Sequence, residues 1–343
     1  MKRFLNTLFV TTPGAYLARD GETLLVRVEQ ETRLRLPIHT LSGIVCFGQV
    51  TASAPLMHLC GEHNVLLSFL SETGRFLGRV CGPVSGNVLL RREQYRRADC
   101  PQKSAAIARS MICGKIMNCR TVLQRALRDY PDANGVSALR TASDNLARTL
   151  AFCGEDLPLD ELRGREGEAG AAYFGVFDAL IISQKEHFQF TGRSRRPPLD
   201  PINALLSFFY TLLVHDVTAA LEGVGLDPAV GFLHRDRPGR PSLALDLMEE
   251  LRPMLADRLV LSLINRRQLQ PRDFIIRENG AVQLTDDARK EVLVAWQKRK
   301  QEEILHPFIN EKIAIGLIPH VQALLLARHL RGDLDTYPPF IWK

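Results

Sequence analysis

Paired cysteine motifs are missing from this chain. Its seven cysteines are an odd number, and no two of them form a Cys-x-x-Cys pair. This pattern argues against a zinc ribbon and against the disulfide framework of a small secreted protein. A reducing cytoplasm is therefore the expected compartment.

Signals for export and membrane insertion are also missing. The opening residues, MKRFLNTLFVTTPGAYLARDG, lack a long apolar core followed by small residues. No run approaches the roughly 18 apolar residues that a membrane span needs. We find no internal repeat and no low-complexity tract. We therefore expect a soluble protein with no membrane partner.

Length and composition indicate a globular protein. The 343 residues are enough for two domains that each bury a core, and 45% of them are hydrophobic. Lys and Arg outnumber Asp and Glu by 44 to 38, which gives a net charge of +6. This charge suits a polyanionic partner such as nucleic acid, but it is common in proteins that never bind one.

The first 90 residues show the pattern of β-strands. Residues 16–28, YLARDGETLLVRV, predict a hairpin around Asp20-Gly21, because Asp-Gly accepts the positive φ angles of a tight turn. Further strands are predicted at residues 43–48 and 65–71. Between them, residues 53–64 predict a short helix with Ser53 as its N-cap and Pro55 in its first turn. The N-terminal part is therefore expected to be a small, mostly β domain.

From about residue 101 the hydrophobic period becomes helical. In residues 102–130 an apolar stripe lies opposite basic residues. The stripe consists of Ile112, Ile116, Leu123 and Leu127. The pattern continues at residues 132–152, 201–221 and 308–330, and one hairpin is predicted at residues 274–285. The predicted fold class is α+β, with a mostly β domain (1–90), a basic linker (91–100) and a larger all-α domain (101–343).

Positive charge is concentrated in residues 91–128. Ten Lys or Arg residues stand there against Glu93 and Asp99, so the net charge of +8 exceeds that of the whole chain. The segment is either a solvated helix surface or a positive field suited to phosphates. A second basic cluster, GRSRRPP at residues 192–198, is expected to be a loop.

Residues 231–253, GFLHRDRPGRPSLALDLMEELRP, combine a histidine with a helix rich in acids. With Ser242 as the N-cap, Asp246, Glu249 and Glu250 share one side of this helix, opposite the apolar side. Neighbouring like charges repel by about 0.2–0.5 kcal/mol per pair, and Arg252 and Arg258 are placed to soften that repulsion. Pro253 should end or kink the helix. Taken alone, the acids favour a solvated face, although the turn-rich residues 235–241 would let His234 approach them.

Glu166 is a second candidate, in residues 162–177, LRGREGEAGAAYFGVF. Five small residues follow it closely, which suggests close packing, whereas the alternative is a glutamate in a first helical turn favoured by the helix dipole. Glu166, His234 and an acid of the later helix would form a set of oxygen ligands with one imidazole. Such a set suits Mg²⁺ or Mn²⁺ better than structural zinc, and a hard cation of this kind supports phosphodiester cleavage or strand transfer.

Four stretches give the chain a family resemblance: GREGEAGAAYF, RRPPLDPINALLSFFYTLL, GFLHRDRPGRPSLALDLMEELRP and the closing YPPFIWK. The sequence resembles the CRISPR-associated integrase of the adaptation module, the first-named core CRISPR protein, of subtype I-C. The stretches follow the family order, and with the β-rich start the resemblance covers essentially the whole chain. Each stretch is weak alone, but together they are highly specific.

The resemblance implies an N-terminal β domain and a C-terminal helical domain. It implies a homodimer, and a heterohexamer in which two such dimers hold a dimer of the small ferredoxin-like second core CRISPR protein. The implied activity is a metal-dependent DNA endonuclease without sequence preference. The implied role in defence is capture of short double-stranded fragments of foreign DNA and joining of their 3′ ends to the CRISPR array beside the leader.

The resemblance also implies a ligand set for Mg²⁺ or Mn²⁺. By position, Glu166, His234 and Glu249 match the catalytic metal ligands of the family. Glu249 stands where many relatives carry Asp, so its side chain is one methylene longer than theirs. Asp246 is implied as a nearby acid that binds metal directly or through water. Glu168 and Glu250 remain surface charges.

Further residues are assigned to positioning and to DNA. Tyr210 and Asn203 are candidates for positioning near the site, with core packing as the alternative for Tyr210. DNA phosphates are expected to contact Arg91, Arg92, Arg96, Arg97, Lys103, Arg125, Arg128, Arg193, Arg195 and Arg196. Binding through these residues should weaken steeply with salt. Two other functions stay open: a non-catalytic DNA-binding assembly scaffold, and a metallohydrolase for small molecules that needs no DNA.

Overall fold

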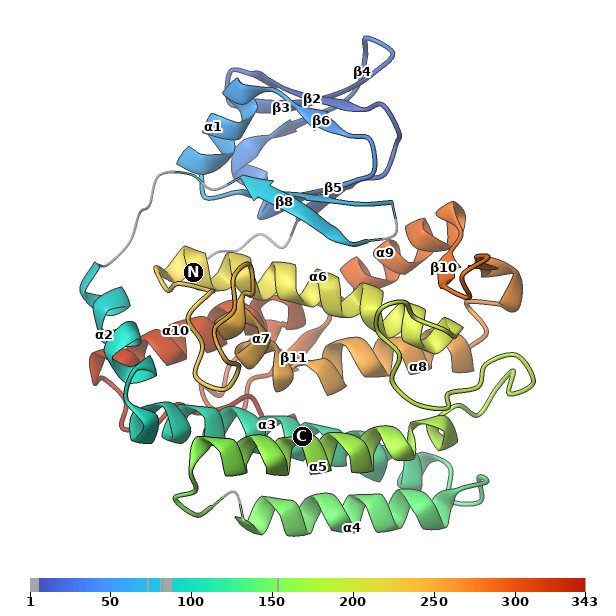
Figure 1. The fold of residues 1–343 in the computed structure, drawn as a ribbon. Coiled ribbons are helices and arrows are strands. Elements are labelled where there is room, and N and C mark those ends of the chain that lie inside the picture. Colours follow the sequence, from blue (N-terminus) through green and yellow to red (C-terminus); the bar gives the residue numbers. More distant parts are fainter. Residues whose placement is uncertain (1–5, 73, 81, 83–87, 153, 343) are drawn as a thin grey trace. The chain divides into compact units, whose positions relative to one another are not determined.

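The computed structural model describes residues 6–72, 74–80, 82, 88–152 and 154–342. They form two compact units. The β unit contains the described residues up to 82 together with Arg289–Gln301, and the helical unit contains residues 88–288 and 302–342. The predicted α+β class is confirmed, since strands fill the N-terminal part and the rest is mostly helical (Figure 1).

Two four-stranded sheets form the β unit. The first has the order β1 (Thr7–Val10), β5 (Gly43–Phe47), β7 (Leu66–Leu70), β8 (Phe76–Val80), and only its β7–β8 pair is antiparallel. The second has the order β4 (Glu31–Pro37), β3 (Thr23–Val28), β2 (Tyr16–Asp20), β6 (Thr51–Ala52). The strands predicted at residues 43–48 and 65–71 are confirmed as β5 and β7.

Two local predictions in this unit are confirmed. β2 and β3 form the antiparallel hairpin, with Asp20 opposite Thr23, so that Gly21 and Glu22 make the turn one residue later than predicted. Gly21 has a φ of +57°, which favours glycine. The short helix is α1 (Ala54–Glu62), and its N-cap is Ser53, whose Oγ accepts a hydrogen bond of 3.3 Å from the backbone N–H of Leu56.

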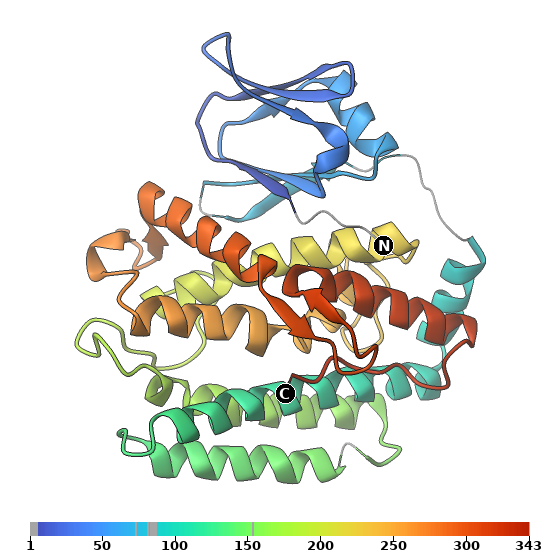
Figure 2. The same cartoon turned by 180° about the vertical axis from the view of Figure 1, so that it is seen from behind.

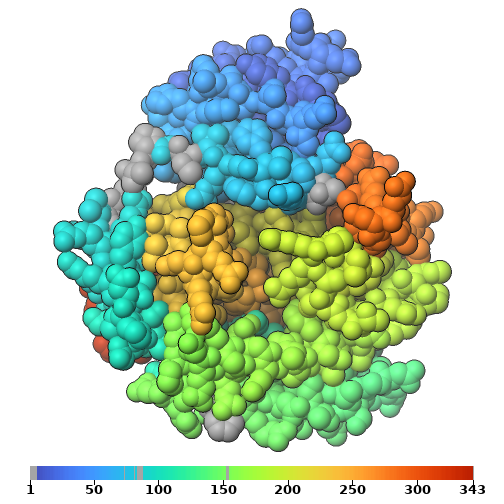
Figure 3. All heavy atoms as spheres, in the orientation of Figure 1, coloured from blue at the N-terminus to red at the C-terminus, as the bar shows by residue number. Residues whose placement is uncertain are grey.

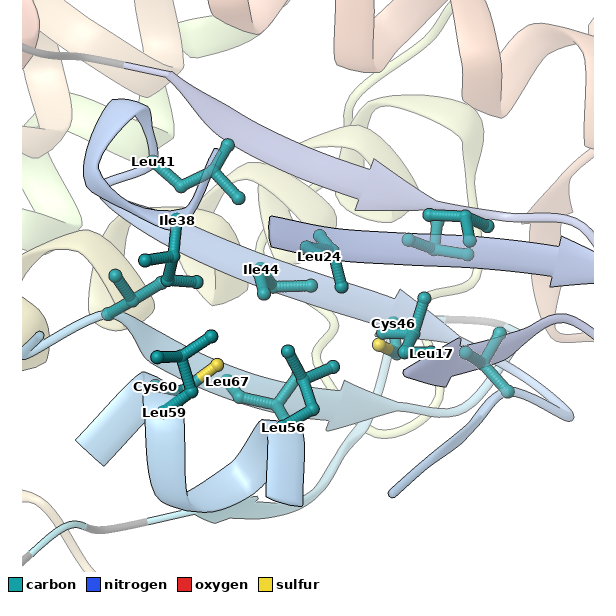
Figure 4. Packing of buried hydrophobic residues seen from close by; sticks show 14 of the residues in the cluster. Leu17, Leu24, Ile38, Leu41, Ile44, Cys46, Leu56, Leu59, Cys60 and Leu67 are labelled. Atoms are coloured by element: carbon teal, nitrogen blue, oxygen red, sulfur yellow. The ribbon is translucent and has the colours of Figure 1, made fainter. Parts of the chain in front are cut away.

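Apolar side chains from both sheets and α1 form the core of the β unit (Figure 4). Two free thiols lie in this core, and burial raises the pKa of Cys46 to about 12 and that of Cys60 to about 11. Both side chains therefore act as small hydrophobic groups rather than as nucleophiles or metal ligands. This agrees with the absence of paired cysteine motifs.

Helices α3, α4 and α5 pack against one another in the helical unit, and α6 packs against α7 and α10 (Figures 1 and 2). The helices of this unit are α2 (Val88–Ala98), α3 (Pro101–Asp129), α4 (Val136–Phe152), α5 (Leu159–Gly175), α6 (Pro201–Val224), α7 (Ser242–Glu249), a π-helical turn (Pro253–Asp257), α8 (Arg258–Asn265) and α10 (Ile318–Arg331). Most of α9 (Asp286–Gln301) belongs to the β unit. Residues 91–98, which we assigned to a linker, lie within α2.

Helix α6 is the apolar centre of the helical unit. Asp200 caps it by accepting a hydrogen bond of 2.7 Å from the backbone N–H of Asn203, and Gly225 ends it in the left-handed conformation at a φ of +86°. We found no run long enough for a membrane span, but within the described residues α6 passes that test by length and composition alone. Most of its apolar window is buried, as in a core helix.

The C-terminal part is not purely helical. The predicted hairpin is confirmed as β9 (Phe274–Ile276) and β10 (Val282–Leu284). The helix predicted from residue 308 is wrong at its start, because Lys312–Ala314 forms β12, which pairs with β11 (Glu303–Leu305). The helix begins only at Ile318, with Pro319 in its first turn, after a stretch whose β-branched isoleucines favour a strand.

Candidate functional site

The acids of α7 are buried, so the solvated-face interpretation is wrong. Asp246 and Glu250 are 0% exposed and Glu249 is 3% exposed. The helix starts at Ser242, which is not the predicted N-cap, because its Oγ donates to the carbonyl oxygen of Arg235 at 3.3 Å. It ends at Glu249, four residues before Pro253, as predicted. The three acids have three different sets of partners.

Asp246 organises the segment that carries His234. Its carboxylate accepts hydrogen bonds from the backbone N–H groups of Phe232, Leu233 and His234, at 2.6, 2.9 and 2.9 Å. It also lies 2.6 Å from Nδ1 of His234. A Cβ on Gly231 would lie 2.7 Å from Oδ2 of Asp246, so the close approach requires glycine there. The contact to Nδ1 leaves Nε2 as the His234 nitrogen for a ligand.

Glu166 and Glu249 meet at one lysine. Lys115 of α3 reaches Glu166 of α5 with its Nζ, which also lies 2.8 Å from Oε2 of Glu249 on α7. Arg252 contributes a second cation, with its guanidinium 2.5 Å from Oε1 of Glu249. We call Lys115, Glu166, Glu249 and Arg252 the lysine-centred site. Three helices that are distant in sequence thus bring two carboxylates to one cationic atom.

Electrostatics keep the lysine-centred site charged. Burial alone would raise the pKa of Glu249, but the Arg252 guanidinium and the Lys115 ammonium lower it to about 2. Burial alone would lower the pKa of Lys115, yet Glu249 and Glu166 raise it above its usual value. Each buried charge is therefore stabilised by an opposite one.

The donor types of this site suit a hard divalent cation. Two carboxylates, Glu166 and Glu249, converge on a single positive atom, Nζ of Lys115. His234 lies close enough to Glu249 for an electrostatic interaction between the two side chains. Within the described residues, however, no three His, Cys, Asp or Glu side chains are already grouped as a metal site. Carboxylates with one imidazole fit Mg²⁺ or Mn²⁺, and Lys115 stands where the carboxylates meet.

Tyr210 lies against the lysine-centred site. Its hydroxyl donates a hydrogen bond of 2.7 Å to Asp257, and its ring lies 4.7 Å from the Arg252 guanidinium and 5.3 Å from that of Arg193. Burial raises the pKa of Asp257 to about 6, although Tyr210, Arg193 and Arg252 each lower it. The tyrosine ring therefore contacts two arginines, of which Arg252 pairs with Glu249.

Asn203 holds the loop that carries Arg193. The asparagine is fully buried on α6, and its Nδ2 donates hydrogen bonds of 2.7 Å to the carbonyl oxygen of Gly192 and 2.6 Å to Asp200. Its Oδ1 accepts from the backbone N–H of Ser194 at 3.1 Å and from the Arg193 guanidinium. Its contacts therefore position Arg193, which in turn lies over Tyr210.

The prediction that Glu250 is a surface charge is wrong. Its carboxylate accepts hydrogen bonds from the Tyr337 hydroxyl at 2.6 Å, Nε2 of Gln322 at 2.8 Å and the backbone N–H of Phe340 at 3.2 Å. Burial raises the pKa of Glu250 to about 8 despite these bonds. Asn118 of α3 completes what we call the C-terminal network, since it donates to the carbonyl oxygens of Glu250 and Phe340 at 2.7 and 2.8 Å. The closing YPPFIWK stretch is thereby fixed to α3 and α7.

Glu168 is exposed, as predicted, and pairs with Arg165 at 3.3 Å. The residues expected to contact DNA fall into two groups. Six are exposed: Arg92, Arg96, Lys103, Arg128, Arg195 and Arg196.

The other four are half-buried and have structural contacts. Arg91 donates to the carbonyl oxygen of Gly225 at 3.1 Å, and Arg97 lies 3.0 Å from both Glu93 and His329. Arg125 lies 4.6 Å from the Trp342 ring, and Arg193 is held as described above. Figure 3 shows the helical unit hollowed where the segment before α7 (yellow-orange), the loop of residues 182–200 (yellow-green) and α5 (green) meet. Arg195 and Arg196 belong to that loop.

Lys115, Arg252 and Asp257 were missed as site residues. Lys115 was counted only with the basic residues of 91–128. A signal was present, because Lys115 lies three residues after Ile112 and four before Cys119, on the buried side of the helix. A lysine on an apolar stripe needs a buried acid as its partner. Arg252 was expected only to soften the repulsion among the acids, and it does pair with Glu249 three positions before it. No local signal marked Asp257.

Comparisons with known proteins agree on one family. A family model described as CRISPR associated protein Cas1 matches residues 8–298. The chain is 55% identical over 343 residues to CRISPR-associated endonuclease Cas1 1 of Chlorobaculum tepidum, which covers 100% of both chains.

Two solved structures share the fold. A casposase bound to integration product has a TM-score of 0.85 at 23% identity and covers 99% of this chain and 95% of that chain. A Cas6-RT-Cas1–Cas2 complex has a TM-score of 0.83 at 24% identity and covers 98% of this chain and 36% of that chain. At these identities the likeness shows the fold alone.

Proposed function

Because the chain belongs to the Cas1 family of CRISPR-associated proteins, we propose that it is a metal-dependent DNA endonuclease and integrase of CRISPR adaptation. Its substrates are short double-stranded fragments of foreign DNA and the leader-repeat DNA of the array. It joins the 3′ ends of the fragments to the array by exchanging phosphodiester bonds, and with water as the nucleophile it cleaves DNA.

The convergence of Glu166 and Glu249 on one cation carries this proposal. The two carboxylates come from α5 and α7, and the adjoining His234 has its Nδ1 held by Asp246. An acid of this kind behind a histidine fixes the ring and makes its other nitrogen a better ligand. The arrangement supports Glu166, His234 and Glu249 as the residues that would hold Mg²⁺ or Mn²⁺.

The bound ion would polarise the target phosphate and lower the pKa of the attacking hydroxyl. Residues of the chain orient the metal ligands and keep them ionised. Asp246 orients His234, and Arg252 keeps Glu249 ionised for metal binding. In strand transfer the 3′ hydroxyl of the fragment forms a new bond to the phosphorus, and the old 3′ oxygen leaves with the proton. One phosphodiester replaces another, so no energy source is needed.

The exposed basic residues supply the DNA surface in this proposal. Arg195 and Arg196 belong to a loop beside the hollow that Figure 3 shows, and Arg92, Arg96, Lys103 and Arg128 lie on α2 and α3. Contacts of this kind to phosphates fix the position of a duplex without reading its sequence. The four half-buried arginines are held by protein groups, so we expect the six exposed residues to contribute most of the affinity.

The family also suggests the assembly. We propose a homodimer that acts with the ferredoxin-like second core CRISPR protein in a heterohexamer, located in the cytoplasm. The complex with Cas2 that shares the fold supports such a partner. The casposase bound to integration product shares this fold, which supports strand transfer as the reaction.

The test uses purified full-length protein, a labelled branched duplex and Mn²⁺. Glu166→Ala, His234→Ala and Glu249→Ala should each remove strand transfer, while the circular dichroism spectrum and the dimer remain. Glu168→Ala is the matched control, since it removes an exposed acid two residues from Glu166 on the same helix. Full activity in all three site variants would contradict the metal assignment.

The same assay separates the two other functions. An assembly scaffold predicts salt-sensitive DNA binding and no product with any divalent ion. A metallohydrolase for small molecules predicts no affinity for DNA even at low salt.

A further inference from the structure

Lys115 is a buried lysine on the mostly apolar buried face of α3. It is 8% exposed, and Ile112, Ile116 and Cys119 on the same face of α3 are buried with it. Taking an ammonium group out of water costs several kcal/mol unless opposite charges compensate. Glu166 and Glu249 provide this compensation.

The contacts of Glu249 are divided between two cations. Its Oε1 pairs with Arg252 at 2.5 Å, and its Oε2 lies 2.8 Å from Nζ of Lys115. Nζ of Lys115 is the atom that also contacts Glu166. The ammonium of Lys115 therefore links the two carboxylates, as a bound divalent cation would.

We propose that Lys115 is the resident counter-ion of the metal site, holding Glu166 and Glu249 together in the metal-free protein and being displaced when a divalent ion binds. The inference rests on the proposed function of the same carboxylates. A metal ion and an ammonium group cannot share these oxygens at contact distance, because like charges repel strongly in a buried site. Metal binding must therefore move the Lys115 side chain.

The charge balance gives this exchange a consequence. In the metal-free protein the lysine-centred site is neutral, with Lys115 and Arg252 against Glu166 and Glu249. A divalent ion adds two positive charges. The displaced ammonium stays near the site, because the Lys115 side chain keeps it there. The site then attracts a phosphodiester, which it does not do when neutral. Lys115 thus links phosphate binding to prior metal binding.

The first experiment measures Mn²⁺ binding to the full chain without DNA, by isothermal titration calorimetry. Lys115→Met removes the charge at similar length, Lys115→Arg keeps it, and Lys312→Met is the control at an exposed lysine of the helical unit. Lys115→Met should bind Mn²⁺ about tenfold more tightly than the natural chain, since no cation has to be displaced. Lys115→Arg and Lys312→Met should show no such gain.

Thermal unfolding gives a second readout on the same proteins. Without metal, Lys115→Met should unfold at a lower temperature than the natural chain, because the buried Glu249 and the half-buried Glu166 lose a counter-ion. Mn²⁺ should raise its midpoint more than that of the natural chain. A gain in Mn²⁺ affinity confined to Lys115→Met supports the proposal.

Mn²⁺ binding by Lys115→Met that is equal to or weaker than that of the natural chain overturns the proposed displacement of Lys115. The metal site itself still stands if the natural chain binds Mn²⁺. Absence of Mn²⁺ binding to every protein would end the proposed metal function, and this inference with it. The two failures are therefore distinguishable.

A measurement on the natural chain covers the case in which Lys115→Met does not fold. The rate at which an acylating reagent modifies Lys115 is followed by mass spectrometry with and without Mn²⁺. Release from two ion pairs should increase the modification of Lys115 several-fold, while exposed Lys312 reacts equally in both conditions. An unchanged rate at Lys115 contradicts displacement.

Discussion

Helix α3 and the end of α7 with its C-cap residue each contribute one residue to two neighbouring networks of opposite electrostatic character. Lys115 and Glu249 belong to the lysine-centred site, and Asn118 and Glu250 belong to the C-terminal network. Glu249 and Glu250 are adjacent in sequence and almost equally buried, yet their pKa values are about 2 and about 8. Burial alone therefore does not decide whether an acid is charged.

The groups that contact each acid decide whether it is charged. Glu249 faces the cations Lys115 and Arg252, whereas Glu250 faces a hydroxyl, an amide and a backbone N–H. Neutral donors offset only part of the desolvation penalty, so Glu250 takes up a proton near neutral pH. The charged network is suited to chemistry with a cation, and the neutral one to fixing the C-terminal segment.

The largest expected effect comes from exchanging each acid for its amide. Glu249→Gln should lower strand transfer and cleavage in Mn²⁺ by about a thousandfold or more, because the amide cannot replace an ionised ligand. Glu250→Gln should change activity less than about threefold, since Glu250 is mostly protonated at pH 7. Rates on one labelled duplex give both numbers. Equal losses in the two variants would refute the contrast.

The second prediction concerns the C-terminal network. Phe340 is fully buried, and its backbone groups bond to Glu250 and Asn118. Phe340→Ala should lower the free energy of unfolding by about 3–5 kcal/mol, as for other large core truncations. Urea unfolding at pH 7 measures this.

Activity per folded molecule tests whether the two networks are independent. It should stay within about threefold for Phe340→Ala at low temperature, because no side chain of the lysine-centred site is removed. A collapse of activity in folded protein would show that the C-terminal segment is required for the chemistry.

Asp257 provides an intermediate case for a pH test. Burial raises its pKa from 3.8 to about 6 in the folded chain. A raised pKa stabilises the fold below pH 3.8, and this contribution is lost as the pH rises through 6. Relative to Asp257→Asn, the natural chain should therefore lose about 2–3 kcal/mol of unfolding free energy between pH 4 and pH 7.

Urea unfolding at several pH values measures the difference between these two proteins. Glu168→Gln, at an exposed acid, is measured beside them as the control for removal of a carboxylate. A constant difference for Asp257→Asn would mean that folding does not raise the pKa of Asp257.

Local determinants explain which parts of the fold were predictable. The hairpin at Gly21 and the cap at Ser53 depend on residues within a few positions of one another, and both were predicted. The start of the last helix was not, because residues 312–314 form a strand only by pairing with 303–305. A helical period in a short apolar run does not reveal such a partner.

The site shows the same limit, because its local sequence pattern does not reveal partners that are distant in sequence. The helical pattern indicated that Asp246, Glu249 and Glu250 cluster, but not what covers them. Glu250 is covered by residues some ninety positions later, and Glu249 pairs with a lysine more than a hundred positions earlier. The family resemblance pointed to Glu166 and Glu249, and the structure places both at one ammonium group. The roles of these residues and of His234 in metal binding stay predictions.

The stoichiometry of Mn²⁺ binding tests the central claim most directly. Electron paramagnetic resonance of free Mn²⁺ during a titration counts the bound ions in the natural chain, Glu249→Gln and Glu250→Gln. The natural chain and Glu250→Gln should each bind about one Mn²⁺ per chain at this site, and Glu249→Gln should lose it. Equal binding by all three proteins would contradict the assignment of the metal to the charged network.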